Sequence, residues 1–191
     1  SDSDLKPFEY KKKFNILYCG NLGIIQLIDL IPEVMKEIDN PNICFNVIGM
    51  GPKTDSLVNK IKQYGLEEKL VYHGPIASKQ ACAYFKSADV LYVSLSKDGY
   101  VGKTIPNKLM MSMAFAKPII GVLSGDGRDV LNASKGGIVC DENIDQIKNA
   151  ITSLYEMSVE ERKNLGELNK VYYQDHFSLD IVVDSLESFL K

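Results

Sequence analysis

Short apolar runs recur along the first 140 positions, and segments with helically spaced apolar residues separate them. The runs that predict strands are 15–20, 44–49, 70–74, 90–95, 118–123 and 136–140. The intervening segments that predict helices are 26–38, 54–64, 79–87, 106–115 and 128–133. Strands and helices are therefore expected to alternate over most of the chain.

Strands that are apolar on almost every residue are typical of parallel strands covered on both faces. We therefore predict an α/β fold, a Rossmann-like doubly wound parallel sheet of about six strands with right-handed crossovers. After Cys140 the pattern is helical only, over 144–156, 159–174 and 179–190. The apolar face of the last helix suggests the surface of a missing partner.

The bulk composition fits one soluble globular domain: 191 residues, 45% hydrophobic and 25% charged. A net charge of −3 argues against a general nucleic-acid binder. Cys19, Cys44 and Cys140 fall inside apolar runs and are expected to be buried free thiols in a reducing, cytoplasmic compartment. No pair of cysteines has the close spacing of a zinc site, and His73 and His176 lie far apart, so we expect no metal and no cofactor.

The two ends of the chain differ from its middle. Residues 1–13 are polar and lack the apolar core of a signal peptide, and no run of about 18 apolar residues follows. We expect 1–13 to be a linker or truncation edge, and 14–191 to be a domain cut from a longer protein.

The stretch 97–120 carries the strongest functional signal. A strand leads into a glycine-containing loop, and a helix is predicted to begin with Pro106 at its first position. A helix N-terminus at the carboxyl end of a strand attracts anions, so a phosphorylated ligand is the first hypothesis. Glycine turns also end other strands, at 20–23, 49–52, 74–75 and 124–127, and in a parallel sheet they meet at one edge.

None of these turns identifies a ligand by itself. The turn at 20–23 is not G-x-G-x-x-G, and no acidic residue ends the next strand, which disfavours a dinucleotide-binding dehydrogenase. A single glycine turn, taken alone, is more often a simple tight connection between a strand and a helix. Lys53, Lys103 and Lys108 are candidates for phosphate contact or solvated lysines, and His73 either packs at its strand end or faces a base.

The motifs together resemble a known family. They are Gly20-Asn21-Leu22-Gly23 with Gln26, Val47 to Pro52, Ala88-Asp89-Val90, Thr104 to Leu109, Ala116 to Ile120, Gly136 to Val139 and His176-Phe177-Ser178. In this order they are similar to the carboxy-terminal half of a GT-B glycosyltransferase. The similarity is to the retaining group 1, or family-four, class and to bacterial enzymes of capsule and O-antigen assembly.

The resemblance implies that a nucleotide-diphosphate sugar binds at the carboxyl edge, without metal. Its diphosphate would lie against Gly20–Gly23 and the helix at Pro106, with the base near His73–Pro75. The implied donor-binding residues are Gly20, Asn21, Leu22, Gly23, Gly51, Lys53, His73, Gly74, Pro75, Thr104, Ile105, Pro106, Asn107, Lys108 and Met111, while the catalytic residue is unknown. The N-terminal acceptor domain would be the missing partner, without which the isolated domain is expected to be inactive. Peripheral attachment of the whole protein at the inner membrane face stays open.

Several positions depart from the family pattern. Asn21 and Gln26 replace an arginine and a lysine, and Lys103 and Met111 stand where the family has two glutamates. Ala116 replaces a glycine, at a cost of about 1 kcal/mol if its turn is left-handed. These departures leave a second hypothesis open, a degenerate GT-B-like scaffold or interaction domain. A GT-B epimerase is a third, but the additional acidic and histidine residues it would usually need are not seen.

Overall fold

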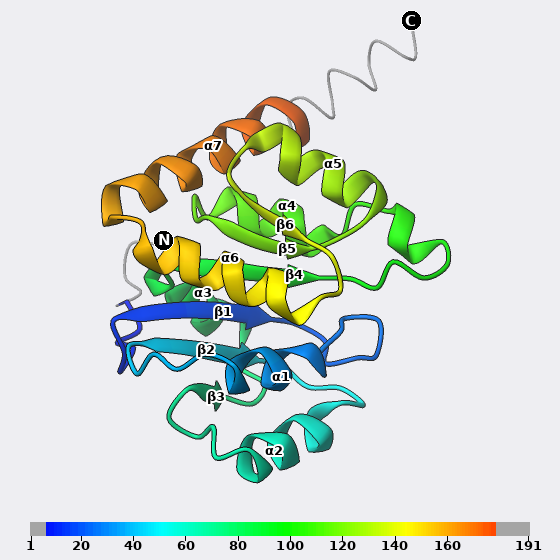
Figure 1. Cartoon of the computed structure of the whole chain (residues 1–191). Coiled ribbons are helices and arrows are strands. Elements are labelled where there is room, and N and C mark those ends of the chain that lie inside the picture. The colour runs from blue at the N-terminus through cyan, green and yellow to red at the C-terminus, as the bar shows by residue number, and fades with distance from the viewer. Residues whose placement is uncertain (1–6, 179–191) are drawn as a thin grey trace, which may run out of the picture.

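The computed structural model describes residues 7–178 and contains one six-stranded sheet, shown in Figure 1. The strands are β1 (Phe14–Cys19), β2 (Ile43–Ile48), β3 (Leu70–Tyr72), β4 (Val90–Ser94), β5 (Ile119–Val122) and β6 (Gly137–Cys140). All neighbouring strands pair in parallel, in the order β3-β2-β1-β4-β5-β6. The predicted doubly wound α/β fold is confirmed.

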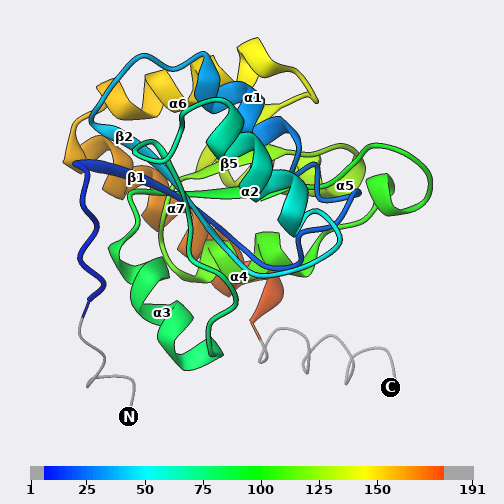
Figure 2. The same cartoon turned by 90° about the horizontal axis from the view of Figure 1, so that it is seen from below.

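Helices cover both faces of the sheet, as Figure 2 shows. They are α1 (Leu30–Lys36), α2 (Thr54–Gln63), α3 (Ser78–Ser87), α4 (Asn107–Ala114), α5 (Gly125–Ser134), α6 (Ile144–Glu156) and α7 (Val159–Phe177). One apolar core joins α1, α2 and α6 to the sheet, and a second joins α3, α4, α5 and α7. Two cores explain why the strands are apolar on nearly every residue.

The strand order reverses between β1 and β4. From β1 the chain continues outward to β2 and β3, and from β4 it continues outward on the other side to β5 and β6. In an open parallel sheet this switch point leaves a crevice at the carboxyl ends of the strands, where ligands bind. In Figure 1 this edge lies on the right, where the loop between β4 and α4 projects. That loop contains a short 3-10 helix, η2 (Val101–Lys103).

Three predicted helix starts are wrong. α1 begins at Leu30 because Leu27 is left-handed (φ 53°) and β4 holds the preceding turn: Ser94 Oγ donates to Gln26 O at 2.6 Å. Pro106 is the extended N-cap of α4, with ψ 136°, rather than its first helical residue. α5 begins at Gly125, where a turn was expected, because the extended Ser124 serves as its N-cap.

Other expectations have mixed outcomes. Cys44 and Cys140 are buried free thiols, but Cys19 is partly exposed because it ends β1 at the open edge. The predicted helix 179–190 lies outside the described residues. No described helix is both long and apolar enough to cross a membrane.

The helix α7 is fastened to the amino edge of the sheet by Asn169, which is fully buried. The Asn169 amide donates to Lys117 O at 2.8 Å and to Gly136 O at 2.7 Å, and its oxygen accepts a hydrogen bond from Ser134 at 2.8 Å. Gly166 adjoins Ala116 O too closely for any Cβ. Ala116 itself is left-handed at φ 53°, which is the condition under which alanine in place of glycine costs about 1 kcal/mol.

Candidate functional site

The glycine turns that follow β1 and β2 form one continuous floor at the carboxyl edge. Leu22 N donates to Met50 O at 2.9 Å, and Lys53 N donates to Leu22 O at 2.8 Å. Gly51 has no room for a side chain, because a Cβ there would lie 2.5 Å from Leu22 O. The two turns therefore depend on glycine for their close approach.

The N-terminus of α4 brings Lys108 onto this floor. Lys108 Nζ donates a hydrogen bond to the Tyr18 hydroxyl at 2.6 Å and lies 4.2 Å from the centre of the tyrosine ring. The Tyr18 hydroxyl in turn donates to Asn21 O at 2.6 Å. The lysine stem fills the space beside Gly20, where any Cβ would overlap Lys108 Cε and Nζ.

The surroundings of Lys108 favour an anionic ligand. Burial lowers the pKa of Lys108 to about 8, because the ammonium group has lost water, and the nearby Cys19 offsets only part of this effect. Among the described residues no side chain caps α4, and Leu109 N donates to Pro106 O at 2.8 Å, so the N–H groups of Asn107 and Lys108 are the ones left for a ligand. A buried cation beside a free helix N-terminus is the arrangement that an oxyanion completes.

These groups border a groove of about 200 Å³ between the end of β4 and the start of α4. Gln26, Ser94, Pro106, Asn107 and Lys108 are among its lining residues. Asn21 lies behind one of these residues, since its amide donates to Gln26 Oε1 at 3.4 Å. The structure thus brings together the predicted residues of the 20–23 turn and the start of α4.

Other predicted residues point elsewhere. The Lys53 ammonium is 2.5 Å from Asp29 Oδ2, in an ion pair between α2 and the start of α1. Thr104 Oγ1 donates to Val101 O at 2.8 Å, within its own loop. Lys103 is exposed, Ile105 is partly buried, and Met111 is 41% exposed on α4.

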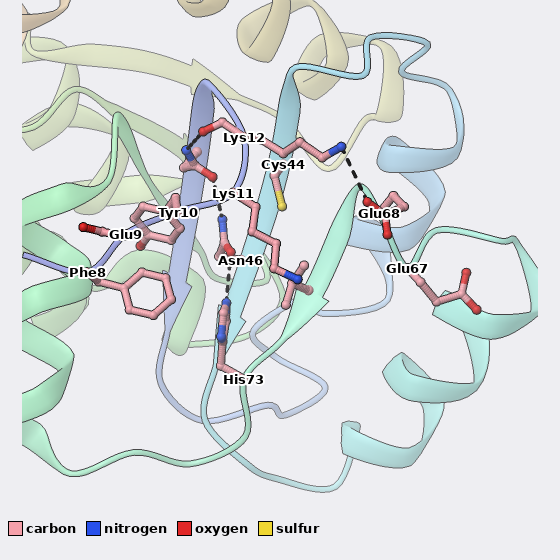
Figure 3. A pocket seen from close by; sticks show the side chains of 12 residues that line it. Phe8, Glu9, Tyr10, Lys11, Lys12, Cys44, Asn46, Glu67, Glu68 and His73 are labelled. Carbon is pink, nitrogen blue, oxygen red and sulfur yellow. Dashed lines mark hydrogen bonds and ion pairs between the residues drawn. The ribbon is translucent and has the colours of Figure 1, made fainter.

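His73 lies at the end of β3 but faces the sheet rather than the groove (Figure 3). Its Nε2 makes a 2.9 Å hydrogen bond with Asn46 Oδ1, and its ring meets Phe8 edge to face. Burial lowers the pKa of His73. Gly74 is left-handed at φ 74°, accepts a hydrogen bond from Gly49 N at 3.0 Å and leads to Pro75 at the carboxyl edge. Only the backbone of this turn reaches the edge where the base was expected.

Tyr18 was not predicted from the sequence as a residue of the site. A tyrosine inside an apolar strand reads as a core residue, and its ring is indeed fully buried. The contact of its hydroxyl with Lys108, 90 positions later, depends on the tertiary fold. The available signal was the position of Tyr18 near the end of a strand that leads into a glycine turn.

Among residues 7–178, no three His, Cys, Asp or Glu side chains gather where they could hold a metal ion. The groove instead offers one ammonium group, amides and backbone N–H donors. Such groups bind an anion and stabilise negative charge.

Comparison with solved structures shows the same fold in several glycosyltransferases. HepE from Anabaena, solved in complex with UDP, superposes with a TM-score of 0.80 at 12% identity, over 93% of this chain and 48% of HepE. TarM superposes with a TM-score of 0.76 at 18% identity, over 97% of this chain and 37% of TarM. A structure of TarM from S. aureus contains UDP. The C-terminal domain of the group 1 family protein LpcC from Francisella tularensis gives 0.70 at 17% identity, over 93% of this chain and 98% of that domain.

Sequence comparison agrees with the fold. A probable glycosyltransferase from Pseudomonas aeruginosa, WbjE, is 31% identical over 118 residues, which are 60% of this chain. The chain spans 28% of the length of WbjE, so it matches only part of that relative. The family model described as glycosyl transferases group 1 matches residues 2–171. The chain therefore belongs to the group 1 glycosyltransferases, a GT-B family.

Proposed function

We propose that this chain is the C-terminal, donor-binding half of a retaining glycosyltransferase. It would bind a nucleotide-diphosphate sugar whose sugar moves to a surface-polysaccharide or lipid-linked acceptor. The observation that carries this proposal is Lys108, held over Gly20 and Tyr18 beside the uncapped N-terminus of α4. UDP is bound in structures of HepE and TarM, which supports a nucleotide ligand.

The groove suggests how the chain would assist the reaction. The leaving group is a nucleoside diphosphate, on which negative charge grows as the bond to the sugar breaks. Lys108 and the first N–H groups of α4 would stabilise that charge, and stabilisation of developing charge is a large catalytic effect. Asn21, Gln26 and Asn107 add neutral hydrogen-bond donors around the groove. We assign no general acid or base, because Lys103 and Met111 replace the family's two glutamates.

The position of the chain within its parent protein is also a proposal. The fold covers 98% of the solved C-terminal domain of LpcC but less than half of HepE, which supports a half-enzyme in residues 14–191. An N-terminal domain of the same protein would supply the acceptor site across the carboxyl edge. Transfer would take place in the cytoplasm or at the inner face of the membrane. The proposed acceptor, a surface polysaccharide or a lipid-linked sugar, follows from the resemblance to enzymes of capsule and O-antigen assembly.

Calorimetric titration with UDP, GDP and their sugars tests the proposal. We expect one nucleotide to bind, and Lys108→Gln to weaken it about tenfold, because an ion-assisted hydrogen bond contributes roughly 1.5–3 kcal/mol. Lys62→Gln is the matched control, since Lys62 is an exposed lysine on α2 that does not line the groove. If no nucleotide binds in the millimolar range, the chain is a scaffold or interaction domain instead.

A further inference from the structure

A second polar pocket lies at the opposite, amino edge of the sheet. It has a volume of about 260 Å³ and is lined by Ser87, Ala88, Asp89, Ala116, Lys117, Pro118, Val159, Arg162 and Lys163. These residues come from the segments just before β4 and β5 and from the first turns of α7. In Figure 1 this edge is on the left, where α7 begins, across the sheet from the donor groove.

Three of the lining residues are cationic and one is anionic. Asp89 is occupied by the fold: its carboxylate accepts a hydrogen bond from Asn15 N at 2.8 Å and lies 3.8 Å from Arg162 Nη2. Arg162 also donates to Leu154 O and Met157 O, at 3.1 and 2.5 Å. The Asp89–Arg162 pair therefore fixes the pocket wall, and Lys117 and Lys163 leave the pocket with net positive charge.

Lys117 lies in this wall, just before β5. Within residues 7–178 its ammonium makes no hydrogen bond and no ion pair, and only the electrostatic attraction of Asp89 is felt there. Burial lowers the pKa of Lys117, because the surrounding protein displaces part of the water around the ammonium group. A half-buried ammonium without an acceptor is a costly arrangement.

Ser87, in the same wall, has a second unsatisfied group. Its hydroxyl is buried and has no hydrogen-bond partner among the described residues. A buried hydroxyl without a partner typically costs about 1–3 kcal/mol. Because the Ser87 oxygen has almost no accessible surface, it lies behind the pocket wall, and the donors that the open space can reach are those of the cationic side chains.

We propose that this pocket binds an oxyanion of phosphate chemistry, either free phosphate or a phosphomonoester. Its oxygens accept a hydrogen bond from Lys117, while Arg162 and Lys163 add positive charge. A tetrahedral phosphate has acceptors in several directions, which suits cations that come from the segment before β5 and from α7. The volume exceeds that of several waters, each about 30 Å³, so the group attached to a phosphomonoester also fits.

The proposal is independent of the donor-binding function, because it uses no residue of the carboxyl-edge groove. The test is a titration of the 191-residue chain with inorganic phosphate and with glycerol 3-phosphate, followed by amide NMR shifts and calorimetry. We expect saturable millimolar binding, with the largest shifts at Ser87 and Lys117. Tighter binding of glycerol 3-phosphate identifies a phosphomonoester as the ligand, and equal or weaker binding identifies free phosphate.

Variants locate the ion. Lys117→Met and Lys163→Met should each weaken phosphate binding several-fold, whereas Lys148→Met, which alters a partly exposed lysine that pairs with Asp145 on α6, should not. Lys108→Gln should also leave phosphate binding unchanged, which separates this pocket from the donor groove. A circular dichroism spectrum confirms that each variant is folded. The proposal is overturned if phosphate does not saturate, or if Lys117→Met binds it as the unaltered chain does.

Discussion

Lys108 of α4 donates a 2.6 Å hydrogen bond to the hydroxyl of Tyr18 in β1, and the same hydroxyl donates to Asn21 O. The start of α4 is thereby tied to the turn after β1 before any ligand arrives. Binding of a diphosphate in the groove would add oxygen acceptors beside an ammonium that is already positioned. Positioned charge costs little reorganisation during a reaction.

Tyr18→Phe should reduce the free energy of unfolding by about 1 kcal/mol, because it removes two hydrogen bonds and keeps the ring. It should also weaken binding of the nucleotide that the domain accepts, since Lys108 would lose its anchor. Urea denaturation and calorimetry measure the two effects. Tyr72→Phe is the control: it removes a hydroxyl that donates to Gly49 O at the same edge without contacting a lysine. Equal nucleotide affinity in both variants would contradict a positioning role for Tyr18.

Gly20→Ala should destabilise the domain more than Gly65→Ala does. Gly65 is left-handed but has open space around it, so alanine there should cost about 1 kcal/mol. At Gly20 the methyl group would also overlap the Lys108 side chain. Urea unfolding of the two variants compares the costs, and similar values would show that Lys108 moves aside freely.

Nucleotide affinity should fall as the pH rises through about 8, the value to which burial lowers the pKa of Lys108. Below that pH Lys108 is charged and attracts the diphosphate, and above it the neutral amine does not. Because the bound anion raises the pKa of Lys108, binding above pH 8 should take up a proton. Calorimetry in buffers of different ionisation enthalpy detects that proton. In Lys108→Met the proton uptake should vanish; if it persists, another group is titrating.

Asn169→Ala should destabilise the fold by about 2–4 kcal/mol, since it removes three buried hydrogen bonds. Ser134 keeps Leu131 O and Gly136 O keeps Ile119 N, whereas Lys117 O loses its partner among the described residues. Thermal and urea unfolding measure the loss. Asn164→Ala is the matched control, because Asn164 is exposed on the same helix. A small effect at Asn169 would mean that α7 is held by its apolar contacts instead.

Ala116→Gly should stabilise the chain by roughly 0.5–1 kcal/mol, because glycine adopts the left-handed backbone of this turn without strain. The same substitution at Ala83, within α3, should have the opposite sign and cost about 1 kcal/mol. Denaturation midpoints of the two variants check the sign. Destabilisation at both positions would show that the Ala116 methyl makes contacts worth more than the strain.

The order of strands and helices was predictable because two-sided burial makes a strand apolar along its length, as in Ile43–Ile48. The start of α1 could not be predicted, because the apolar residues before Leu30 fit a helix by their spacing. In the structure they form turns, and Ser94 of β4 donates a hydrogen bond to Gln26 O there. In the candidate site, Lys108 and Gly20 could be predicted from the edge at which their loops meet. Their direct contact, the role of Tyr18 and the ion pair of Lys53 depend on side-chain packing across elements, which no local pattern encodes.

The strands at the two borders of the sheet are short: β3 has three residues and β6 has four. A border strand offers its unpaired backbone groups to any other chain in solution, and the number of such groups grows with its length. With only three or four residues, β3 and β6 offer an incoming strand few backbone groups for hydrogen bonding. The sheet that forms a crevice at its centre therefore also protects the protein from edge-to-edge aggregation at high concentration.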